Sequence, residues 1–280
     1  MAVEIVTDSL SDITPEFAKE LGITVVPLYV RFGEEAYRDR VEMSTDEFYH
    51  RLINGPNLPT TTQPSPGDFL DVFKKLAKKT DEILVVTVSG MLSGTYQSAM
   101  QAKNMMEEGE CRIEVIDSRK VAMSLGLIVI KATEAARTGA NLDELADLVR
   151  RALPRSNLVV YFDTLKYLAK GGRIGKAQGL LGAMLSIKPI LTIKDGEMAP
   201  LTRVRSPAAG LDYLYNFVSG FAKIESMAVE HSTVPDEADG LVERLSKILP
   251  KERIYRAVVS PVLGTYAGPY AIALTVLEAE

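Results

Sequence analysis

Residues 83–96 read ILVVTVSGMLSGTY, a short apolar run that passes directly into a loop of glycines and hydroxyl side chains. The run Ile83–Val88 is rich in Val and Ile and is bounded by turn residues, which predicts a buried strand. Outward from this strand, similar runs at Val3–Val6, Thr24–Tyr29 and Arg112–Ile116 predict three further strands of the same kind. The first half of the chain is therefore expected to contain a sheet of buried strands.

Between these runs, the starts of helices are well marked. Ser44 and Ser65 each precede an acidic residue by three positions, the spacing at which a hydroxyl caps a helix and the carboxylate completes a capping box. Pro66 then occupies the first helical position, where proline is tolerated, and Asn141 repeats the pattern before a helix that ends near Leu153. Alternation of strands and helices predicts crossover units and a mainly parallel sheet.

The second half of the chain follows a different pattern. Leu158–Phe162 predicts a strand, and Asp195-Gly196 lies between two apolar runs, which is a strong signal for a β-hairpin. Helices are predicted at Ser206–Ala222 and Pro235–Leu249. We therefore expect a two-domain α/β protein, with an N-terminal α/β domain over residues 1–156 and a C-terminal α+β domain over residues 157–280. The other strands expected in the second domain are Pro189–Ile193, Met198–Val204, Ser226–His231, Arg253–Val259 and Ala271–Leu277.

Charge and composition argue against several classes of function. The chain has 280 residues, and 32 Lys and Arg against 37 Asp and Glu give a net charge of −5, which does not favour nucleic acid. The single cysteine, Cys111, excludes an intramolecular disulfide and suits a reducing compartment. The apolar runs around Val121–Ile130 and Leu180–Ile187 are too short to span a membrane, and the start lacks a signal-peptide pattern. We expect a cytoplasmic protein with no stable membrane insertion, no metal and no cofactor.

Four segments, each expected to be a loop, combine glycine, proline and hydroxyl side chains just beyond a strand or just before a helix. In open parallel sheets, ligands bind outside the carboxyl ends of the strands, where a loop that enters a helix presents free backbone N–H groups to an anion. Hydroxyl groups add neutral donors, so such a site suits one carboxylate or phosphate. Each segment also has a simpler interpretation, since Asp8, Ser65 or Ser93 can cap a helix and Thr61-Thr62 can form a turn. The four segments are Thr7–Ser9, Thr60–Ser65, Ser89–Tyr96 and Gly264–Pro269.

Six short motifs extend over nearly the whole chain: TDS at 7–9, TTQPS at 61–65, SGMLSGTYQSA at 89–99, DTLKYLAKGGRI at 163–174, IKPI at 187–190 and GTYAGP at 264–269. In this order they resemble the motifs of the DegV family. The resemblance implies a DegV-like fold with a long-chain fatty acid bound between two domains. Family members are also described as subunits of a bacterial fatty acid kinase. The resemblance thus implies a separate ATP-using kinase subunit as partner and acyl-phosphate for phospholipid synthesis as product.

The resemblance also implies which residues hold the ligand. Hydroxyls of the second and third motifs would hydrogen-bond the carboxylate, with one backbone N–H beside them. The family's last loop normally reads Gly-Thr-His-x-Gly-Pro-Gly, whereas in this chain Tyr266 replaces the histidine and Tyr270 replaces the final glycine. This departure changes the side chain that would contact the carboxylate head group of the fatty acid. The expected ligand-binding residues are Thr61, Thr62, Ser93, Gly94, Thr265 and Tyr266.

The acyl chain and the partner would use other segments. The apolar run at 179–185 fits an acyl-chain pocket, although ordinary core packing explains such a run equally well. Arg173 is expected either to pair with an acidic side chain such as Asp8 or to face a partner. Arg203 and Arg205 follow the hairpin, where they either dock the kinase subunit or belong to an ordinary solvated surface. The expected pocket residues are Leu181, Met184, Leu185 and Ile190.

Other functions have weaker support. The segment GGRIGK at 171–176 is one residue short of a nucleotide-binding P-loop, and Ala177 replaces the Ser or Thr that would meet Mg²⁺. A serine hydrolase using Ser89 or Ser93 needs a base, yet the two histidines, His50 and His231, lie outside the glycine loops. A lipid reservoir or sensor without a kinase partner is the main alternative. The chain itself is expected to be a ligand-binding subunit rather than an enzyme.

Overall fold

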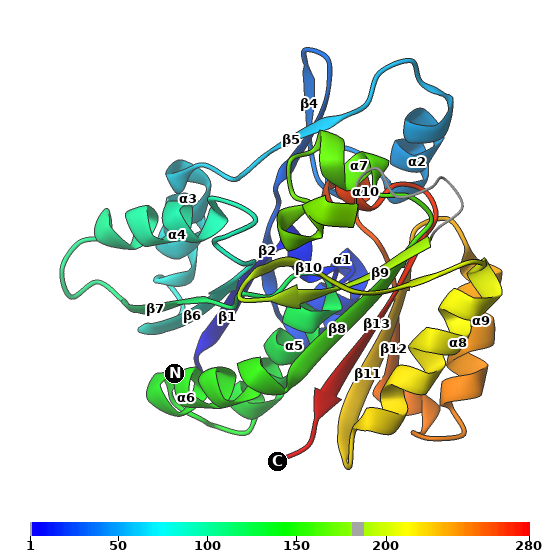
Figure 1. Ribbon diagram of the computed structural model, residues 1–280. Coiled ribbons are helices and arrows are strands. Elements are labelled where there is room, and N and C mark those ends of the chain that lie inside the picture. The colour runs from blue at the N-terminus through cyan, green and yellow to red at the C-terminus, as the bar shows by residue number, and fades with distance from the viewer. Residues whose placement is uncertain (1, 181–187) are drawn as a thin grey trace.

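The computed structural model describes residues 2–180 and 188–280 and arranges them in layers (Figure 1). A parallel sheet and a larger mixed sheet lie on either side of a central helix, α5 (Met123–Arg137), which contacts strands of both. Helices α3 and α4 cover the outer face of the first sheet, and α8 and α9 cover that of the second (Figure 1). This arrangement agrees with the α/β class predicted from the sequence.

The first sheet has four parallel strands in the order β2-β1-β6-β7. Helix α3 starts with the predicted capping box: the Ser65 hydroxyl accepts the Asp68 N–H, the Asp68 carboxylate accepts the Ser65 N–H, and Pro66 follows at the first helical position. Its Phe69 and Phe73 are fully buried against the sheet. The elements of this half are β1 (Glu4–Asp8), α1 (Pro15–Leu21), β2 (Thr24–Val26), α3 (Pro66–Leu76), β6 (Glu82–Thr87), α4 (Thr95–Asn104), β7 (Arg112–Asp117) and α6 (Leu142–Ala152).

The prediction of one continuous strand over Thr24–Tyr29 is wrong. The chain leaves the first sheet after β2 and enters a different, three-stranded sheet as β3 (Tyr29–Phe32). Pro27 stands at the break, where it has no N–H to donate to a strand ladder. The next N–H, that of Leu28, donates to the hydroxyl of Ser9, the residue after β1, at 3.1 Å, which fixes the chain at the point where it leaves the first sheet.

The three-stranded sheet has the antiparallel order β4-β3-β5. It includes β4 (Glu35–Arg38) and β5 (Thr60–Thr62), so the expectation that Thr60–Ser65 is entirely loop is wrong for its first three residues. Because β5 pairs with β3, the hydroxyls of this segment are held on a sheet rather than in a free turn.

The second sheet has six strands in the order β10-β9-β8-β13-β11-β12, antiparallel except between β11 and β12. The predicted hairpin is confirmed: Asp195 and Gly196, with φ of 56° and 88°, join β9 to β10. The elements of this half are β8 (Ser156–Phe162), α7 (Lys166–Lys170), β9 (Lys188–Lys194), β10 (Glu197–Val204), α8 (Pro207–Phe217), β11 (Ile224–His231), α9 (Pro235–Leu245), β12 (Ile254–Val258), α10 (Pro261–Ala267) and β13 (Ala271–Glu278).

The motif at 264–269, predicted as a loop, is mostly helical. Helix α10 starts with Pro261 at its first position and ends at Ala267, followed by the C-cap residue Gly268, whose φ of 75° favours glycine. It packs against α7, against α2 (Thr45–Asn54) and against the three-stranded sheet. The last turn of α10 is therefore held beside β5, far from it in sequence.

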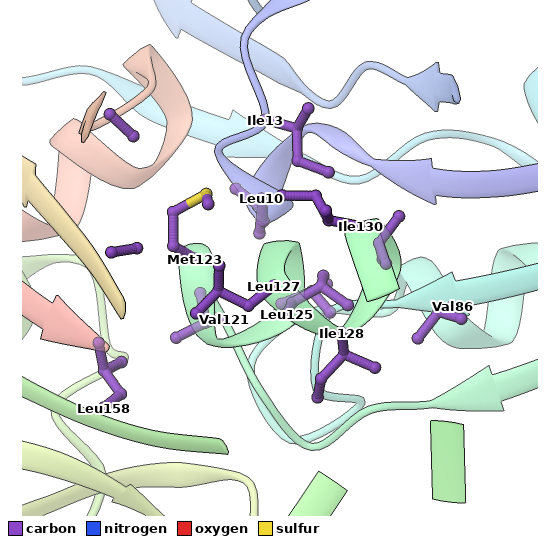
Figure 2. Close-up of a cluster of buried hydrophobic side chains, with 14 of the residues drawn as sticks. Leu10, Ile13, Val86, Val121, Met123, Leu125, Leu127, Ile128, Ile130 and Leu158 are labelled. Atoms are coloured by element: carbon purple, nitrogen blue, oxygen red, sulfur yellow. The ribbon is translucent and has the colours of Figure 1, made fainter. Parts of the chain in front are cut away.

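Helix α5 forms the centre of the core (Figure 2). Its Leu125 and Ile128 are fully buried, and its start packs near Leu10 and Leu158 from opposite halves of the chain. Because this one helix packs against both sheets, the two halves of the chain share a hydrophobic core. The domain boundary after residue 156 stays a prediction. Within residues 2–180 and 188–280, no helix is both long and apolar enough to cross a membrane.

Candidate functional site

An apolar cavity lies between the second sheet and α10. It has an empty volume of about 730 Å³, including its open mouth. Side chains of β8 and β13 form one wall, and those of α7 and α10 form another. Figure 2 shows three of its lining residues, Leu10, Val121 and Leu158. The lining residues are Leu10, Leu92, Val121, Ala122, Leu158, Val160, Phe162, Leu168, Arg173, Met198, Glu230, Val259, Leu263, Tyr266, Ala267, Ala271 and Ala273.

A polar pocket adjoins this apolar cavity. The structure brings Thr61, Thr62 and Ser93 together in its wall, as the sequence motifs predict, although 31 residues separate the last two in sequence. Four residues line both spaces: Leu10, Leu92, Arg173 and Tyr266. The two spaces therefore adjoin each other at these four residues.

Ser93 lies in the loop between β6 and α4. Its Oγ is 2.8 Å from the Thr95 hydroxyl and accepts the Thr95 N–H at 3.4 Å. The N-cap of α4 is Gly94, and this helix start has no side-chain cap. Since a capping hydroxyl accepts from the second or third helical N–H, Ser93 is not the N-cap of α4. The structure thus does not support the simpler interpretation of Ser93 as a helix cap.

Tyr266 lies at the boundary between the apolar cavity and the polar pocket. Its hydroxyl hydrogen-bonds the Thr61 hydroxyl at 2.5 Å, and the Arg173 guanidinium lies over its ring, 5.3 Å from the centroid. Arg173 is itself held by two backbone carbonyls, since its Nε donates to Leu92 O at 3.2 Å and its Nη1 donates to Gly171 O at 2.9 Å. The tyrosine that replaces the family histidine therefore presents its hydroxyl to the polar pocket.

Gly94 packs closely against the side chain of Gln63. A Cβ at this position would lie 2.3 Å from Gln63 Oε1 and 2.5 Å from Nε2, so any larger residue would displace this amide. The amide Nε2 in turn donates to the Ser98 hydroxyl at 3.4 Å. The close approach of Gly94 thus joins the second and third motifs beside the polar pocket, whose lining includes Gln63 and Ser98 but not Gly94 itself.

Two other expected site residues also lie elsewhere. Thr265 is buried in α10, where its hydroxyl donates to the carbonyl oxygen of Pro261 at 3.1 Å, and the structure does not bring it to the polar pocket. Ile190 is opposite Tyr161 and packs on the outer face of the sheet, whereas Val160 on the other face lines the cavity. Successive side chains of a strand point to opposite faces, so Ile190 does not line this cavity. Leu181, Met184 and Leu185 lie outside the described residues.

Asp8 does not pair with Arg173, contrary to one expectation. The Asp8 side chain is fully buried and accepts the N–H of Val88 at 2.7 Å and that of Leu10 at 2.9 Å. Burial raises the pKa of Asp8 to about 7, although these two N–H donors oppose the rise. Asp8 therefore holds the ends of β1 and β6 together. The expected docking residues Arg203 and Arg205 are exposed, the first in β10 and the second just after it.

The hydrolase alternative gains no support from the geometry. The Ser89 hydroxyl is buried and donates to Gly196 O at 2.6 Å, which ties the hairpin to the loop after β6. Neither His50 nor His231 lines the polar pocket that contains Ser93. A serine nucleophile in this pocket would therefore have no histidine base beside it.

The sequence motifs missed a group of buried charges beside the cavity. Arg40 lies 3.7 Å from Asp12 and donates to the backbone carbonyl of Val258, so it links the two halves of the chain. Burial raises the pKa of Asp12, that of Asp39 to about 7, and that of Glu230 well above its usual range. In the sequence, the signal that could have pointed to Glu230 was a carboxylate within the predicted buried strand 226–231. The described residues contain no cluster of His, Cys, Asp or Glu placed to hold a metal ion.

Comparison with known proteins gives one consistent family. Residues 2–279 match the family model described as "Uncharacterised protein, DegV family". The chain belongs to the DegV family. A DegV domain-containing protein of Caldanaerobacter subterraneus subsp. tengcongensis is 38% identical over 273 residues, which is 96% of each chain.

Solved DegV structures share this fold. A DegV family protein from Thermus thermophilus, whose structure is described as showing fatty acid binding, superposes with a TM-score of 0.91 at 30% identity over 100% of both chains. A stearic acid-binding protein from Eubacterium ventriosum superposes with a TM-score of 0.90 at 25% identity, over 99% of this chain and 98% of its own. These superpositions confirm the predicted α/β fold class.

Proposed function

We propose that this DegV protein binds a long-chain fatty acid, with its carboxylate in the polar pocket and its acyl chain in the apolar cavity. The observation that carries the proposal is that an apolar cavity adjoins a polar pocket, with Leu10, Leu92, Arg173 and Tyr266 lining both. The related proteins from Thermus thermophilus and Eubacterium ventriosum, described as fatty acid- and stearic acid-binding, support it. A carboxylate with an unbranched apolar tail matches both spaces.

The energetics suit such a ligand. Burial of each methylene contributes about 0.8 kcal/mol, so a palmitoyl chain contributes on the order of 10 kcal/mol before the costs of binding. The hydroxyls of Thr61, Thr62 and Ser93 then need only to place the carboxylate. Each hydrogen bond to a charged group adds about 1.5–3 kcal/mol. The apolar cavity therefore supplies most of the affinity, and the polar pocket supplies the orientation.

We further propose that the protein presents the bound carboxylate to a separate ATP-dependent kinase subunit, which forms acyl-phosphate. The hydroxyl-bearing side chains of the polar pocket include exposed ones, such as Thr62 and Ser65, so a carboxylate there lies near the surface. Among the described residues of the glycine-rich segment 171–176, no P-loop spacing is present for ATP. Arg173, Arg203 and Arg205 are exposed cations that suit a docking surface for that subunit.

Ligand binding is tested by organic extraction of the purified protein followed by mass spectrometry. We expect about one C14–C18 fatty acid per chain, because burial of the acyl chain in the apolar cavity should slow its loss during purification. A protein that is purified empty and takes up no added stearic acid in a calorimetric titration would contradict the proposal.

The kinase role is tested separately. The chain alone is expected to consume no ATP, whereas mixing it with a fatty acid kinase subunit and ATP should form acyl-phosphate, trapped as the hydroxamate. Tight fatty-acid binding without this product would favour a lipid reservoir or sensor. ATP turnover by the isolated chain would reject the role of a carrier.

A further inference from the structure

Arg173 carries the only charge among the described residues that line the polar pocket. The other lining residues offer hydroxyl groups, the Gln63 amide and apolar atoms, and none of them is acidic. Glu197, which lines a neighbouring space together with Arg173, pairs instead with Lys176 at 3.4 Å. A carboxylate in the polar pocket would therefore meet Arg173 as its one counter-charge among these residues.

The protein itself uses only part of the Arg173 guanidinium. Nε donates to Leu92 O at 3.2 Å and Nη1 donates to Gly171 O at 2.9 Å. The other N–H donors of the guanidinium, on Nη1 and Nη2, make no hydrogen bond among the described residues. Such a planar group of donors matches the two oxygens of a carboxylate. The placement of the guanidinium therefore decides whether these donors reach a ligand in the pocket.

The ring of Tyr266 is the third contact that holds this guanidinium. Arg173 Cζ lies over the ring, 5.3 Å from its centroid, which is within the range of a cation–π interaction. The ring is fixed in turn at two points. Its hydroxyl bonds the Thr61 hydroxyl at 2.5 Å, and its edge lies so close to Gly171 that a Cβ there would be 2.4 Å from Tyr266 Cδ1. The ring is therefore a fixed support for the guanidinium.

We propose that Tyr266 is a positioning residue, whose ring holds Arg173 as the counter-charge of the ligand carboxylate. The proposal rests on the proposed function, since it assumes that a carboxylate occupies the polar pocket. A tyrosine presents the negative face of an uncharged ring to a cation. The histidine of the usual family motif is a smaller ring, and it would repel a guanidinium whenever it gained a proton. The replacement of histidine by Tyr266 therefore adds a support for Arg173.

The experiment measures a charge preference, which is the ratio of the affinity for palmitic acid to that for its uncharged analogue hexadecanamide, on delipidated protein at about pH 8. Arg173→Met should lower this preference about ten- to a hundredfold. Tyr266→Phe and Tyr266→Leu both lack the hydroxyl, but only phenylalanine keeps an aromatic ring. The preference of Tyr266→Leu should therefore be about two- to fivefold lower than that of Tyr266→Phe. The two should become equal when Arg173→Met is added to each.

Tyr270→Leu removes an exposed ring just beyond α10 and serves as the matched control, with the preference unchanged. A second measurement does not depend on how well Tyr266→Leu folds. The guanidinium NMR signals of Arg173, assigned by their loss in Arg173→Lys, should shift more with palmitic acid than with hexadecanamide, in wild type and in Tyr266→Phe.

Three results would overturn the positioning role and leave fatty-acid binding intact. They are equal preferences for Tyr266→Phe and Tyr266→Leu, a difference between these variants that persists with Arg173→Met, and Arg173 signals that do not respond to palmitic acid. Failure of both palmitic acid and hexadecanamide to bind the wild type would instead overturn the proposed function.

Discussion

Replacing Asp39 by asparagine is expected to stabilise the protein at and above neutral pH. Asp39 follows β4 and is 2% exposed, and the Ser9 hydroxyl and the Val262 N–H lie beside its carboxyl group. Burial raises its pKa from the usual 3.8 to about 7, against the opposing effect of Arg40. At pH values between these two, the folded protein therefore holds a proton on Asp39 that the unfolded chain releases.

The size of the effect follows from the two pKa values. A carboxyl group with a higher pKa in the folded state contributes stability that is complete below about pH 4 and is lost as the pH rises through about 7. At about 1.36 kcal/mol per pH unit, the difference amounts to about 4 kcal/mol lost by about pH 8. Of this, about 2.5 kcal/mol is lost between about pH 5 and pH 8. Asparagine does not titrate and avoids the loss.

The assay is urea unfolding of delipidated wild type and Asp39→Asn at several pH values from about 5 to 8, since bound ligand would add its own stabilisation. The free energy of unfolding of the variant should rise relative to that of the wild type by about 2.5 kcal/mol across this range. Asp71→Asn, at an exposed position of α3, is the matched control and should follow the wild type. Parallel curves for wild type and Asp39→Asn would show that Arg40 keeps Asp39 ionised, and would refute the reasoning.

Three further predictions concern the candidate ligand site. Ser93→Ala should weaken fatty-acid binding about ten- to a hundredfold in calorimetric titration, because a hydrogen bond to a charged group contributes about 1.5–3 kcal/mol. Its unfolding temperature should not change, and lower stability with intact affinity would favour a structural role. Tyr266→Phe removes the hydroxyl that bonds Thr61 and should weaken binding about tenfold, whereas Tyr266→His should make the affinity depend on pH between about 6 and 8. Equal affinities for wild type and Tyr266→Phe across that range would remove Tyr266 from the head-group contact. Ala273→Leu fills part of the apolar cavity and should shorten the longest saturated acid that binds in a chain-length series. An unchanged length limit would place the acyl chain elsewhere.

Elements that depend on near neighbours in the chain were predictable from the sequence. The capping box of Ser65 and Asp68 forms between residues three apart, and Pro66 fits the first helical position because the N–H that proline lacks would be unpaired there anyway. The turn at Asp195 and Gly196 depends on the φ values that these two residues tolerate. In each case the deciding interaction lies within the segment itself.

The candidate site was predictable only in part. Thr61, Thr62, Ser93 and Tyr266 do meet at one polar pocket, as expected from motifs at the ends of strands. Thr265 does not join them, because α10 continues through this motif and the Thr265 hydroxyl bonds to the helix backbone. A glycine-rich motif indicates a backbone conformation or a close contact that favours glycine. It does not show whether the chain there is a loop or the end of a helix.

The sequence by itself determined the α/β class, the parallel first sheet, the hairpin and the family, because periodicity, capping and turn chemistry act over a few residues. Only the tertiary structure decided which side chains meet across long separations, such as Tyr266 with Thr61. It also decided which face of each strand lines the cavity, excluding Ile190 and including Glu230. The alternation of a strand divides its side chains into two faces. Which face meets a cavity depends on the elements that pack against the sheet, and these come from distant parts of the chain.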